Sequence, residues 1–413
     1  MRGIYNISIA LYYFVIRLVS PFNRKASLWI NGRKDLWNRL RLVNESQIPV
    51  IWIHCSSLGE FEQGRTVIER LKTEIPGMKI LLTFFSPSGY TVRKNYQQCD
   101  WVEYMPLDTR KNAKKFLDLV KPSLVLFIKY EFWFHHLSEI RNRNIPAYLI
   151  SANFRENQIF FKWYGSWYRK ILQAYRIIFV QNERSKSLLE SIGYNKVYIA
   201  GDTRFDRVKS IMQQSKDIKI AEEFSRNHFV IVAGSTWDKD EDLIFDCLKD
   251  SFNKVKVILA PHEIGKVNLS RLKVQWNNQI VFYSEADLDS VNRAKILVID
   301  NVGMLSSLYK YGKLAYIGGG FGKGIHNILE AATFGMPVVF GPNYRKFHEA
   351  IELVELKAAF PVSNSIDFRE ILDRCLKDTQ FLKQTSSIAA TYVSDKAGAT
   401  ELVLSIIKSQ LKI

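Results

Sequence analysis

The sequence has few cysteines, and they form no motif. Its 413 residues include four, which are far apart and make neither a CxxC pair nor a cluster with histidine: Cys55, Cys99, Cys247 and Cys375. This spacing excludes a disulfide framework and a Cys/His zinc site, and it fits a reducing compartment. Low-complexity tracts are also missing. Because 47% of the residues are apolar, the chain can build two cores.

Acidic residues are scarce relative to basic ones. The chain has 41 Asp and Glu against 58 Lys and Arg, a formal charge of +17 at pH 7. An excess of this size predicts an anionic partner, either a nucleic acid or an anionic membrane surface. The basic-aromatic motifs and basic helices of nucleic-acid-binding proteins do not occur in the sequence, so we expect no nucleic-acid partner.

The most apolar stretch, residues 3–22, is too interrupted for a full membrane span. Arg17 breaks it, and no small-residue cleavage site of a signal peptide follows. As a helix it would carry polar side chains on one narrow face, at spacings of 4, 7, 4 and 3 residues: Arg2, Asn6, Tyr13, Arg17 and Ser20. The pattern predicts an amphipathic helix that ends before Pro21.

Basic residues cluster around this stretch. The first 45 residues hold eight basic and two acidic side chains. We therefore expect residues 1–22 to lie in the interface of an anionic membrane, with Arg17, Arg24 and Lys25 at lipid headgroups or at a phosphorylated acceptor. The alternative is an ordinary amphipathic helix packed on the protein's own core.

Beyond residue 45, short apolar runs alternate with amphipathic helical stretches. The runs predicted to be buried strands are 50–55, 79–85, 123–129, 147–152, 176–181, 229–234, 254–260, 280–284, 295–300, 313–319 and 337–341. Buried strands separated by helices indicate parallel sheets. The polar segment 201–227 lacks a strand, so the crossing between two domains is expected near 205–220.

The predicted fold class is therefore α/β, with two Rossmann-like parallel-sheet domains that face a cleft. We place the domains at 23–210 and 211–413, after the membrane-associated helix over 1–22. Open parallel sheets bind ligands beyond the carboxyl ends of their strands. Functional side chains are expected there.

Two glutamates follow strands of the first domain. Glu60 lies in the first turn of a helix, where its carboxylate could act as a general base on a substrate hydroxyl. The sequence "SLGE" is also a capping box between Ser57 and Glu60, and that alternative stays open. Glu131 follows strand 123–129 and is expected to begin a helix, where the helix dipole alone would favour a carboxylate.

Polar groups also follow strands of the second domain. Ser235 and Thr236 come after strand 229–234, where they could bind an anion or simply cap a helix. His262 comes after strand 254–260 and could contact a phosphate or a base. A structural role for this single histidine is equally open.

The glycine-rich segment 318–324, "GGGFGKG", precedes a helix expected to begin near His326. It does not match the P-loop pattern, because no Ser or Thr follows Lys323. We interpret it as a phosphate cradle made of backbone N–H groups and a helix N-terminus, formed by Gly318, Gly319 and Gly320. Glu330, one turn into the helix on the face of Asn327, could accept both hydroxyls of a ribose.

These residues together resemble one family of GT-B glycosyltransferases, the 3-deoxy-D-manno-octulosonic acid (Kdo) transferases. The resemblance covers nearly the whole chain in order. Besides the basic, apolar N-terminus it rests on "HCSSLGE" (54–60), "YEFW" (130–133), "SAN" (151–153), "GDTRFD" (201–206), "AGST" (233–236), "HNILEAATFGMPVVFGP" (326–342) and "NYRKFHEA" (343–350). Each motif is weak by itself, and their order makes the match specific.

The resemblance implies roles for single residues. Glu60 matches the catalytic base, and Glu131 a second glutamate near the acceptor or the donor sugar. Ser235, Thr236, Asn327 and Glu330 match the CMP-binding side, with Glu330 on the ribose; departures from the family pattern include Lys129 in place of a glutamate, Phe134, Ile325, Asp202, Arg204 and the run "APHEI". These departures concern the donor-phosphate contacts more than the chemistry.

The implied reaction is an inverting transfer of Kdo from CMP-Kdo to a lipid A precursor, at the cytoplasmic face of the inner membrane. It needs neither a metal ion nor a cofactor, because no Asp-x-Asp metal motif is evident. One alternative is a GT-B transferase that uses a UDP- or GDP-sugar on another envelope acceptor. Another is a peripheral membrane scaffold without activity.

Overall fold

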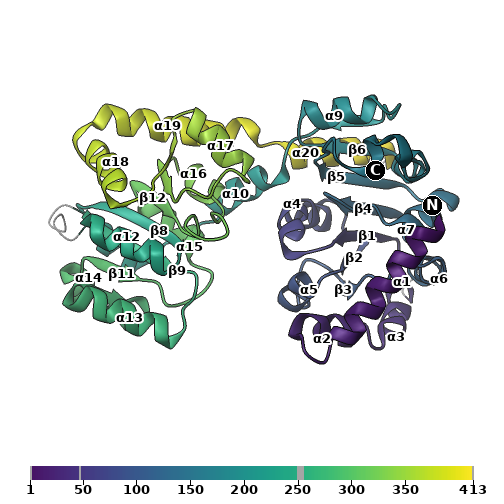
Figure 1. Cartoon of the computed structure of the whole chain (residues 1–413), viewed down its shortest axis with the longest axis horizontal. Helices are drawn as coiled ribbons and strands as arrows, with labels where there is room; N and C mark the ends of the chain where they lie inside the picture. The colour runs from purple at the N-terminus through teal and green to yellow at the C-terminus, as the bar shows by residue number, and fades with distance from the viewer. Residues whose placement is uncertain (1, 46–47, 249–254, 412–413) are drawn as a thin grey trace. The chain divides into compact units, whose positions relative to one another are not determined.

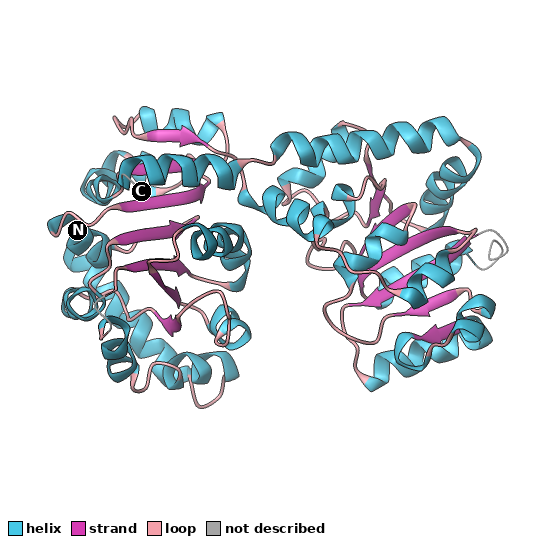
Figure 2. Cartoon of the chain, turned by 180° about the vertical axis from the view of Figure 1, so that it is seen from behind, coloured by secondary structure: helices cyan, strands magenta, loops and turns pink. Residues whose placement is uncertain are grey.

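The computed structural model describes residues 2–45, 48–248 and 255–411. Its contacts divide the chain into two compact units, each with one seven-stranded sheet (Figures 1 and 2). Met1–Arg207 and Ala397–Ile413 form the first unit, and Val208–Lys396 forms the second. The cleft predicted between the domains stays a prediction.

The first unit is a parallel sheet in the order β3-β2-β1-β4-β5-β6-β7. Its strands are β1 (Val50–Cys55), β2 (Lys79–Phe84), β3 (Trp101–Tyr104), β4 (Leu124–Ile128), β5 (Ala147–Ala152), β6 (Ile177–Val180) and β7 (Val197–Ile199). Its helices are α1 (Arg2–Val19), α2 (Arg24–Asn31), α3 (Leu36–Arg41), α4 (Leu58–Glu74), α5 (Pro87–Arg93), α6 (Arg110–Val120), α7 (Phe134–Asn142), α8 (Ser166–Arg169), α9 (Glu183–Glu190) and α20 (Ala399–Leu411). Helix α10 (Thr203–Gln213) continues into the second unit.

The second unit repeats the architecture in the order β10-β11-β9-β8-β12-β13-β14. Its strands are β8 (Phe229–Thr236), β9 (Val255–Pro261), β10 (Ile280–Phe282), β11 (Ile296–Val298), β12 (Leu314–Ile317), β13 (Val338–Phe340) and β14 (Ala359–Pro361). Its helices are α11 (Lys219–Ser225), α12 (Asp238–Leu248), α13 (Lys266–Trp276), α14 (Leu288–Arg293), α15 (Leu305–Leu308), α16 (Leu329–Thr333), α17 (His348–Glu355), α18 (Ser365–Lys377) and α19 (Thr379–Lys396).

In both sheets the order in which the strands are added reverses at one place, the switch point, and ligands bind beside it. In the first sheet the chain runs from β1 outward to β3 and then returns to place β4 on the other side of β1. In the second sheet β8 and β12 are the corresponding neighbours. Open parallel sheets hold their ligands beyond the carboxyl ends of such neighbouring strands. The loops after these four strands are therefore the candidate sites.

The central strands form as predicted because they are apolar on both faces. Every residue of β1, β4 and β5 is buried. All eleven predicted strands are present, with ends shifted by a few residues. The sequence analysis missed the short strands β3, β7 and β14, which lie at sheet edges. The predicted α/β class with two parallel sheets is confirmed.

The C-terminal helix α20 packs with the first unit, although the second domain was expected to extend to residue 413. Three of its apolar side chains join the buried core that covers one face of the first sheet: Val403, Leu404 and Ile407. The hydroxyls of Thr66 and Thr400 also meet, with their oxygens 2.9 Å apart. The chain returns to the first unit because burying the apolar face of α20 there stabilises the fold.

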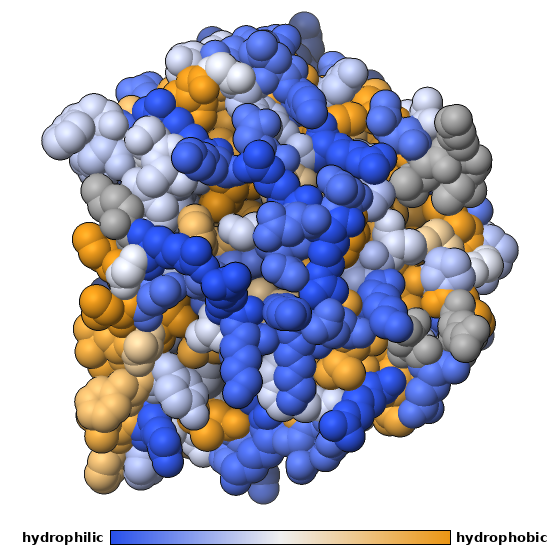
Figure 3. Space-filling model, turned by 90° about the vertical axis from the view of Figure 1, so that its right-hand side faces the viewer, coloured by the Kyte–Doolittle hydropathy of each residue, from blue (hydrophilic) through white to orange (hydrophobic). Residues whose placement is uncertain are grey.

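Helix α1 contacts the first unit with one side and exposes apolar side chains on the other. Tyr5 donates a hydrogen bond to the buried Asp108 carboxylate, and Asn6 Oδ1 lies 2.7 Å from His135 Nε2. The exposed apolar side chains of α1 and the turn after it include Ile4, Ile7, Leu11, Phe14, Val15, Leu18 and Phe22. Apolar side chains gather along the left edge of the face shown in Figure 3.

No single helix within the described residues is long and apolar enough to cross a membrane. The bent pair α1 and α2, with an angle of 116° between them, passes that test by length and composition when taken together. The amphipathic helix is present, with Asn6 of its polar stripe turned to the protein. Membrane contact stays a prediction.

We expect Leu404→Ala to destabilise the first unit by about 2–5 kcal/mol, because removing a buried leucine side chain leaves a cavity. Leu404 is 1% exposed, whereas Leu402 on the same helix is 39% exposed. Urea unfolding followed by tryptophan fluorescence would measure the change. Leu402→Ala, the matched control, should change stability by less than about 1 kcal/mol. Equal effects of the two substitutions would contradict the packing of α20.

Candidate functional site

Glu131 lies buried at the carboxyl end of β4 and binds the end of β1. Its carboxylate accepts hydrogen bonds from the backbone N–H of Ser56 (3.1 Å), the Ser56 hydroxyl (3.0 Å) and the indole N–H of Trp133. His54 Nε2 lies 3.3 Å from the same carboxylate. The prediction that Glu131 begins a helix is wrong, because α7 starts at Phe134 and these donors hold the loop in another conformation.

Glu60 lies in the first turn of α4, next to Glu131. The Ser57 hydroxyl donates to the Glu60 carboxylate at 3.0 Å and makes no side-chain capping bond to the backbone. The two side chains therefore bond to each other, and the bond from the Ser57 side chain to the backbone that a capping box needs is not made. Burial, and then the charge of Glu131, raise the pKa of Glu60 above its ordinary value. A carboxyl with a raised pKa is a better proton acceptor near neutral pH, which suits a general base.

The chain around Glu60 is open to a ligand. A Cβ atom on Gly59 would meet only the Ser57 hydroxyl, at 4.0 Å. The neighbouring Glu131 side chain is 1% exposed and held by its donors, so it is a fixed charge beside a more accessible one. The structure brings together the two glutamates predicted for the first domain.

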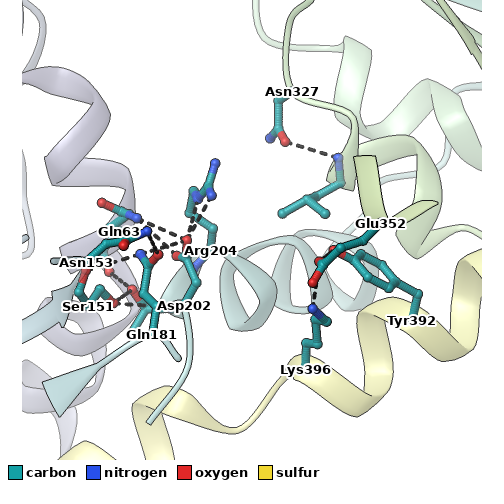
Figure 4. Close-up of polar contacts among 12 residues, drawn as sticks. Gln63, Ser151, Asn153, Gln181, Asp202, Arg204, Asn327, Glu352, Tyr392 and Lys396 are labelled. Carbon is teal, nitrogen blue, oxygen red and sulfur yellow. Dashed lines mark hydrogen bonds and ion pairs between the residues drawn. The ribbon is translucent and has the colours of Figure 1, made fainter. Parts of the chain in front are cut away.

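A buried polar network extends this site to the ends of β5 and β6 (Figure 4). Its centre is the Asp202 carboxylate, which accepts from Gln63 Nε2 (3.1 Å) and Gln181 Nε2 (3.0 Å) and binds Arg204 Nε (2.9 Å). Ser151 belongs to it through its hydroxyl, 2.9 Å from that of Thr203. Sequence reasoning assigned none of these residues to a site, although the motifs "SAN" and "GDTRFD" contain four of them: Ser151, Asp202, Thr203 and Arg204.

In the second unit, the glycine loop after β12 packs tightly against other backbone segments. A Cβ on Gly318 would lie 2.2 Å from the carbonyl oxygen of Ser235, and one on Gly320 would lie 2.5 Å from the backbone nitrogen of Gly341. Gly318 N–H donates to Gly234, and Gly319 N–H to the Asp240 carboxylate. These glycines thus let the loop fold against the sheet. Their contact with a phosphate stays a prediction.

The helix after the loop begins later than predicted. It is the short α16, which starts at Leu329 rather than near His326. Asn327 Nδ2 donates to Glu330 Oε1 at 2.9 Å. Asn327 Oδ1 accepts from the Leu329 N–H, the dashed line at Asn327 in Figure 4. Asn327 lies before the helix and not on its face, but its side chain still meets and orients the Glu330 carboxylate. The role of Glu330 at a ribose stays a prediction.

The remaining predicted donor residues lie at the carboxyl ends of β8 and β9: Ser235 and Thr236 are the last residues of β8, not residues after it, and His262 directly follows β9. Ser235 has a left-handed backbone, with φ of 56°. The Thr236 hydroxyl donates to the buried Glu241 carboxylate at 2.8 Å. The His262 ring stacks on the rings of Trp237 and His326, with centroids 4.5 and 4.6 Å away. Sequence reasoning did not assign these two partners, although each lies within one position of an assigned residue.

The described residues contain no group of three or more His, Cys, Asp and Glu side chains that could hold a metal ion. The three basic residues predicted for the membrane or acceptor lie at the end of α1 and the start of α2, and they are exposed: Arg17, Arg24 and Lys25.

The fold matches that of sugar-nucleotide enzymes. The crystal structure of UDP-GlcNAc 2-epimerase from Neisseria meningitidis bound to UDP-GlcNAc has a TM-score of 0.59 at 17% identity, covering 88% of this chain and 100% of that chain. Identity this low shows the fold alone. The two doubly wound units define a protein of the GT-B class.

Sequence comparisons relate the chain to one family of transferases. Residues 34–207 match the family described as 3-deoxy-D-manno-octulosonic-acid transferase (kdotransferase). The transferase of that name from Aquifex aeolicus is 29% identical over 325 residues, 77% of this chain and 83% of the relative. That from Rickettsia typhi is 25% identical over 363 residues, 86% of this chain and 78% of the relative. The chain is thus similar to Kdo transferases over most of its length, in agreement with the resemblance found in its motifs.

We expect Glu60→Gln to raise the melting temperature at neutral pH. The pKa of Glu60 is raised in the folded state, so the folded chain keeps this proton to higher pH than the unfolded chain does. Wild-type stability should therefore fall as pH rises from the unfolded pKa, ~4.3, through the raised folded value. Glutamine avoids that loss and can still accept the Ser57 hydrogen bond.

Melting curves of both proteins between acidic and neutral pH would measure this difference. Glu62→Gln is the control, because Glu62 on the same helix binds Arg93 at 2.8 Å and its replacement should not stabilise the chain. If Glu60→Gln were less stable than wild type at neutral pH, the raised pKa would be contradicted.

Proposed function

We propose that this glycosyltransferase moves Kdo from CMP-Kdo to a sugar hydroxyl of the lipid A precursor lipid IVA, with inversion at the anomeric carbon. The observation that carries the proposal is the pair of glutamates at the switch point of the first sheet, in a chain that is similar to Kdo transferases. One is accessible with a raised pKa, and the other is fixed in the core.

Glu60 is the general base in this mechanism. It removes the proton of the acceptor hydroxyl while that oxygen forms a bond to the anomeric carbon of Kdo. The bond from this carbon to the CMP oxygen breaks, and CMP leaves with the electron pair. Glu131 assists indirectly, because its charge raises the pKa of Glu60 and makes it a stronger base.

The second unit supplies the donor site. Glu330, held by Asn327, accepts the ribose hydroxyls. The loop 318–324, Ser235, Thr236 and His262 surround the phosphate. The proposal assigns stabilisation of the departing charge to protein N–H groups and cations, and it gives no role to a metal ion.

An amphiphilic acceptor fits the first unit, because aromatic rings connect the exposed helix α1 to Glu131. Tyr12 stacks on Phe85 with centroids 6.0 Å apart, and Phe85 meets Trp133 at 4.6 Å. The Trp133 indole donates to Glu131. An acceptor with acyl chains along α1 would thus present its sugar near the glutamates. The exposed basic residues Arg17, Arg24 and Lys25 suit its phosphates and an inner-membrane surface at the cytoplasmic face.

We expect purified protein to add Kdo-sized masses to a lipid A precursor when CMP-Kdo is generated in situ. Glu60→Gln should lower the rate by about 10²–10⁴-fold, as loss of a general base does. Mass spectrometry of the acceptor and CMP release would measure both. Glu62→Gln, on the same helix, should keep most of the activity.

Other outcomes of this experiment would separate the alternatives. CMP release without a gain in acceptor mass would indicate hydrolysis or another acceptor. A folded protein that neither reacts nor binds CMP would contradict the Kdo donor, and UDP- and GDP-sugars would then be tested in its place.

We also expect the triple variant Ile7→Ser, Leu11→Ser and Leu18→Ser to lose most binding to anionic lipid vesicles. These side chains are 58–67% exposed on α1, and each buried apolar side chain contributes about 1.5–3 kcal/mol to partitioning. Vesicle flotation would measure the fraction of each protein bound to the vesicles.

The matched control replaces three side chains of the second unit, each 83–89% exposed, by serine: Val267, Val274 and Val302. This control variant should still bind the vesicles. Equal binding of both variants would contradict a membrane role for α1.

A further inference from the structure

Three aromatic rings meet at the switch point of the second sheet. Trp237 follows β8, His262 follows β9, and His326 lies beyond the glycine loop after β12. Since β9, β8 and β12 are neighbours in the sheet, their carboxyl ends lie side by side. His262 stacks on each of the other two rings at an interplanar angle of 27°. The other two rings meet at their edges.

The contact between the edges of Trp237 and His326 determines which ring nitrogen of His326 carries the proton. Trp237 Nε1 donates a hydrogen bond to His326 Nε2 at 3.2 Å. An indole N–H can only donate, so His326 Nε2 must carry a lone pair. Burial, and then the neighbouring His262, lower the pKa of His326, which favours the neutral ring. A neutral imidazole with an unprotonated Nε2 carries its single proton on Nδ1.

The surrounding backbone holds this contact in place. One oxygen of the buried Asp240 carboxylate, Oδ2, accepts hydrogen bonds from the backbone N–H of Trp237 and from the backbone N–H of Gly319, each at 2.9 Å. This carboxylate therefore ties the tryptophan to the glycine loop. Gly319 also makes room for the imidazole, because a Cβ there would lie 3.1 Å from His326 Cδ2. The backbone of Trp237 and the glycine loop beside His326 are thus held by one buried carboxylate, while Trp237 itself is 40% exposed.

We propose that Trp237 is a positioning residue that holds His326 as the Nδ1–H tautomer, so that its N–H can donate to a phosphate oxygen of the donor nucleotide. The nucleotide rests on the proposed function. His326 directly precedes Asn327, which orients Glu330, so the donor group lies next to the residues assigned to the ribose. A neutral N–H binds the phosphate without adding a charge that would retain the CMP product.

Nitrogen NMR of the full-length, ¹⁵N-histidine-labelled protein tests the tautomer without any ligand. His326→Gln assigns the signals by their loss. The wild-type ring should show a protonated Nδ1 and an unprotonated Nε2. Trp237→Phe keeps an aromatic ring and removes the N–H, so it should give a mixture that includes the Nε2–H form.

Trp163→Phe is the matched control, since Trp163 is 89% exposed in the first unit. It should leave the His326 signals unchanged. An Nε2–H ring in the wild type would overturn the proposal, and this spectrum decides the point even if Trp237→Phe fails to fold. An unchanged tautomer in a folded Trp237→Phe variant would overturn it as well.

Calorimetric titration with CMP tests the consequence for binding. Trp237→Phe should weaken CMP binding about two- to tenfold, as the loss of one hydrogen bond does. Trp237→His, which offers a ring N–H, should restore part of the affinity. An altered tautomer with unchanged CMP affinity would overturn the positioning role. A folded wild type that does not bind CMP would overturn the proposed donor and the ligand assigned to His326, whereas the tautomer is judged by its own spectrum.

Discussion

The first unit depends on the buried carboxylate of Glu131. A carboxylate in a protein core costs several kcal/mol unless hydrogen bonds replace its water. Here the Ser56 backbone and hydroxyl and the Trp133 indole supply them, and the Tyr175 hydroxyl binds the Glu131 carbonyl. The carboxylate therefore joins the ends of β1 and β4, fixes the turn that leads to Glu60, and excludes a helix at its own position.

In the second unit a buried aspartate, Asp240, joins the ends of two strands in the same way. The buried Asp240 carboxylate accepts from the backbone after β8 and after β12, and from the Tyr316 hydroxyl at 2.8 Å. Neighbouring strands at a switch point leave a gap between their loops, which would otherwise hold water. In both sheets an acidic side chain bridges that gap through backbone N–H groups. The bridge positions the side chains that we assign to the substrates.

The sequence was informative where burial is local and continuous. Strand β4 is apolar at every position, and β1 at every position except His54, so both could be predicted. The closeness of Asn327 to Glu330, three residues further on, could also be predicted. The edge strand β7 has three residues and only Val197 is buried, so no pattern marks it. The Asp202 network joins Gln63 to a residue 139 positions away, and the contact of Thr66 with Thr400 on α20 spans 334 positions. Contacts of this kind depend on the whole fold and leave no local periodicity.

The fold tolerates an electrostatic cost at Glu60. Placing it beside another carboxylate in a partly buried turn raises its pKa, which means that its charged form destabilises the folded chain. Strands β1 and β4, which lead into the turns that hold Glu60 and Glu131, are buried at every residue, and each buried apolar side chain there contributes about 1.5–3 kcal/mol. Their packing offsets the electrostatic cost. Burial, and then the repulsion from Glu131, raise the pKa of Glu60 and so make it a better proton acceptor, at a cost in stability that the core offsets.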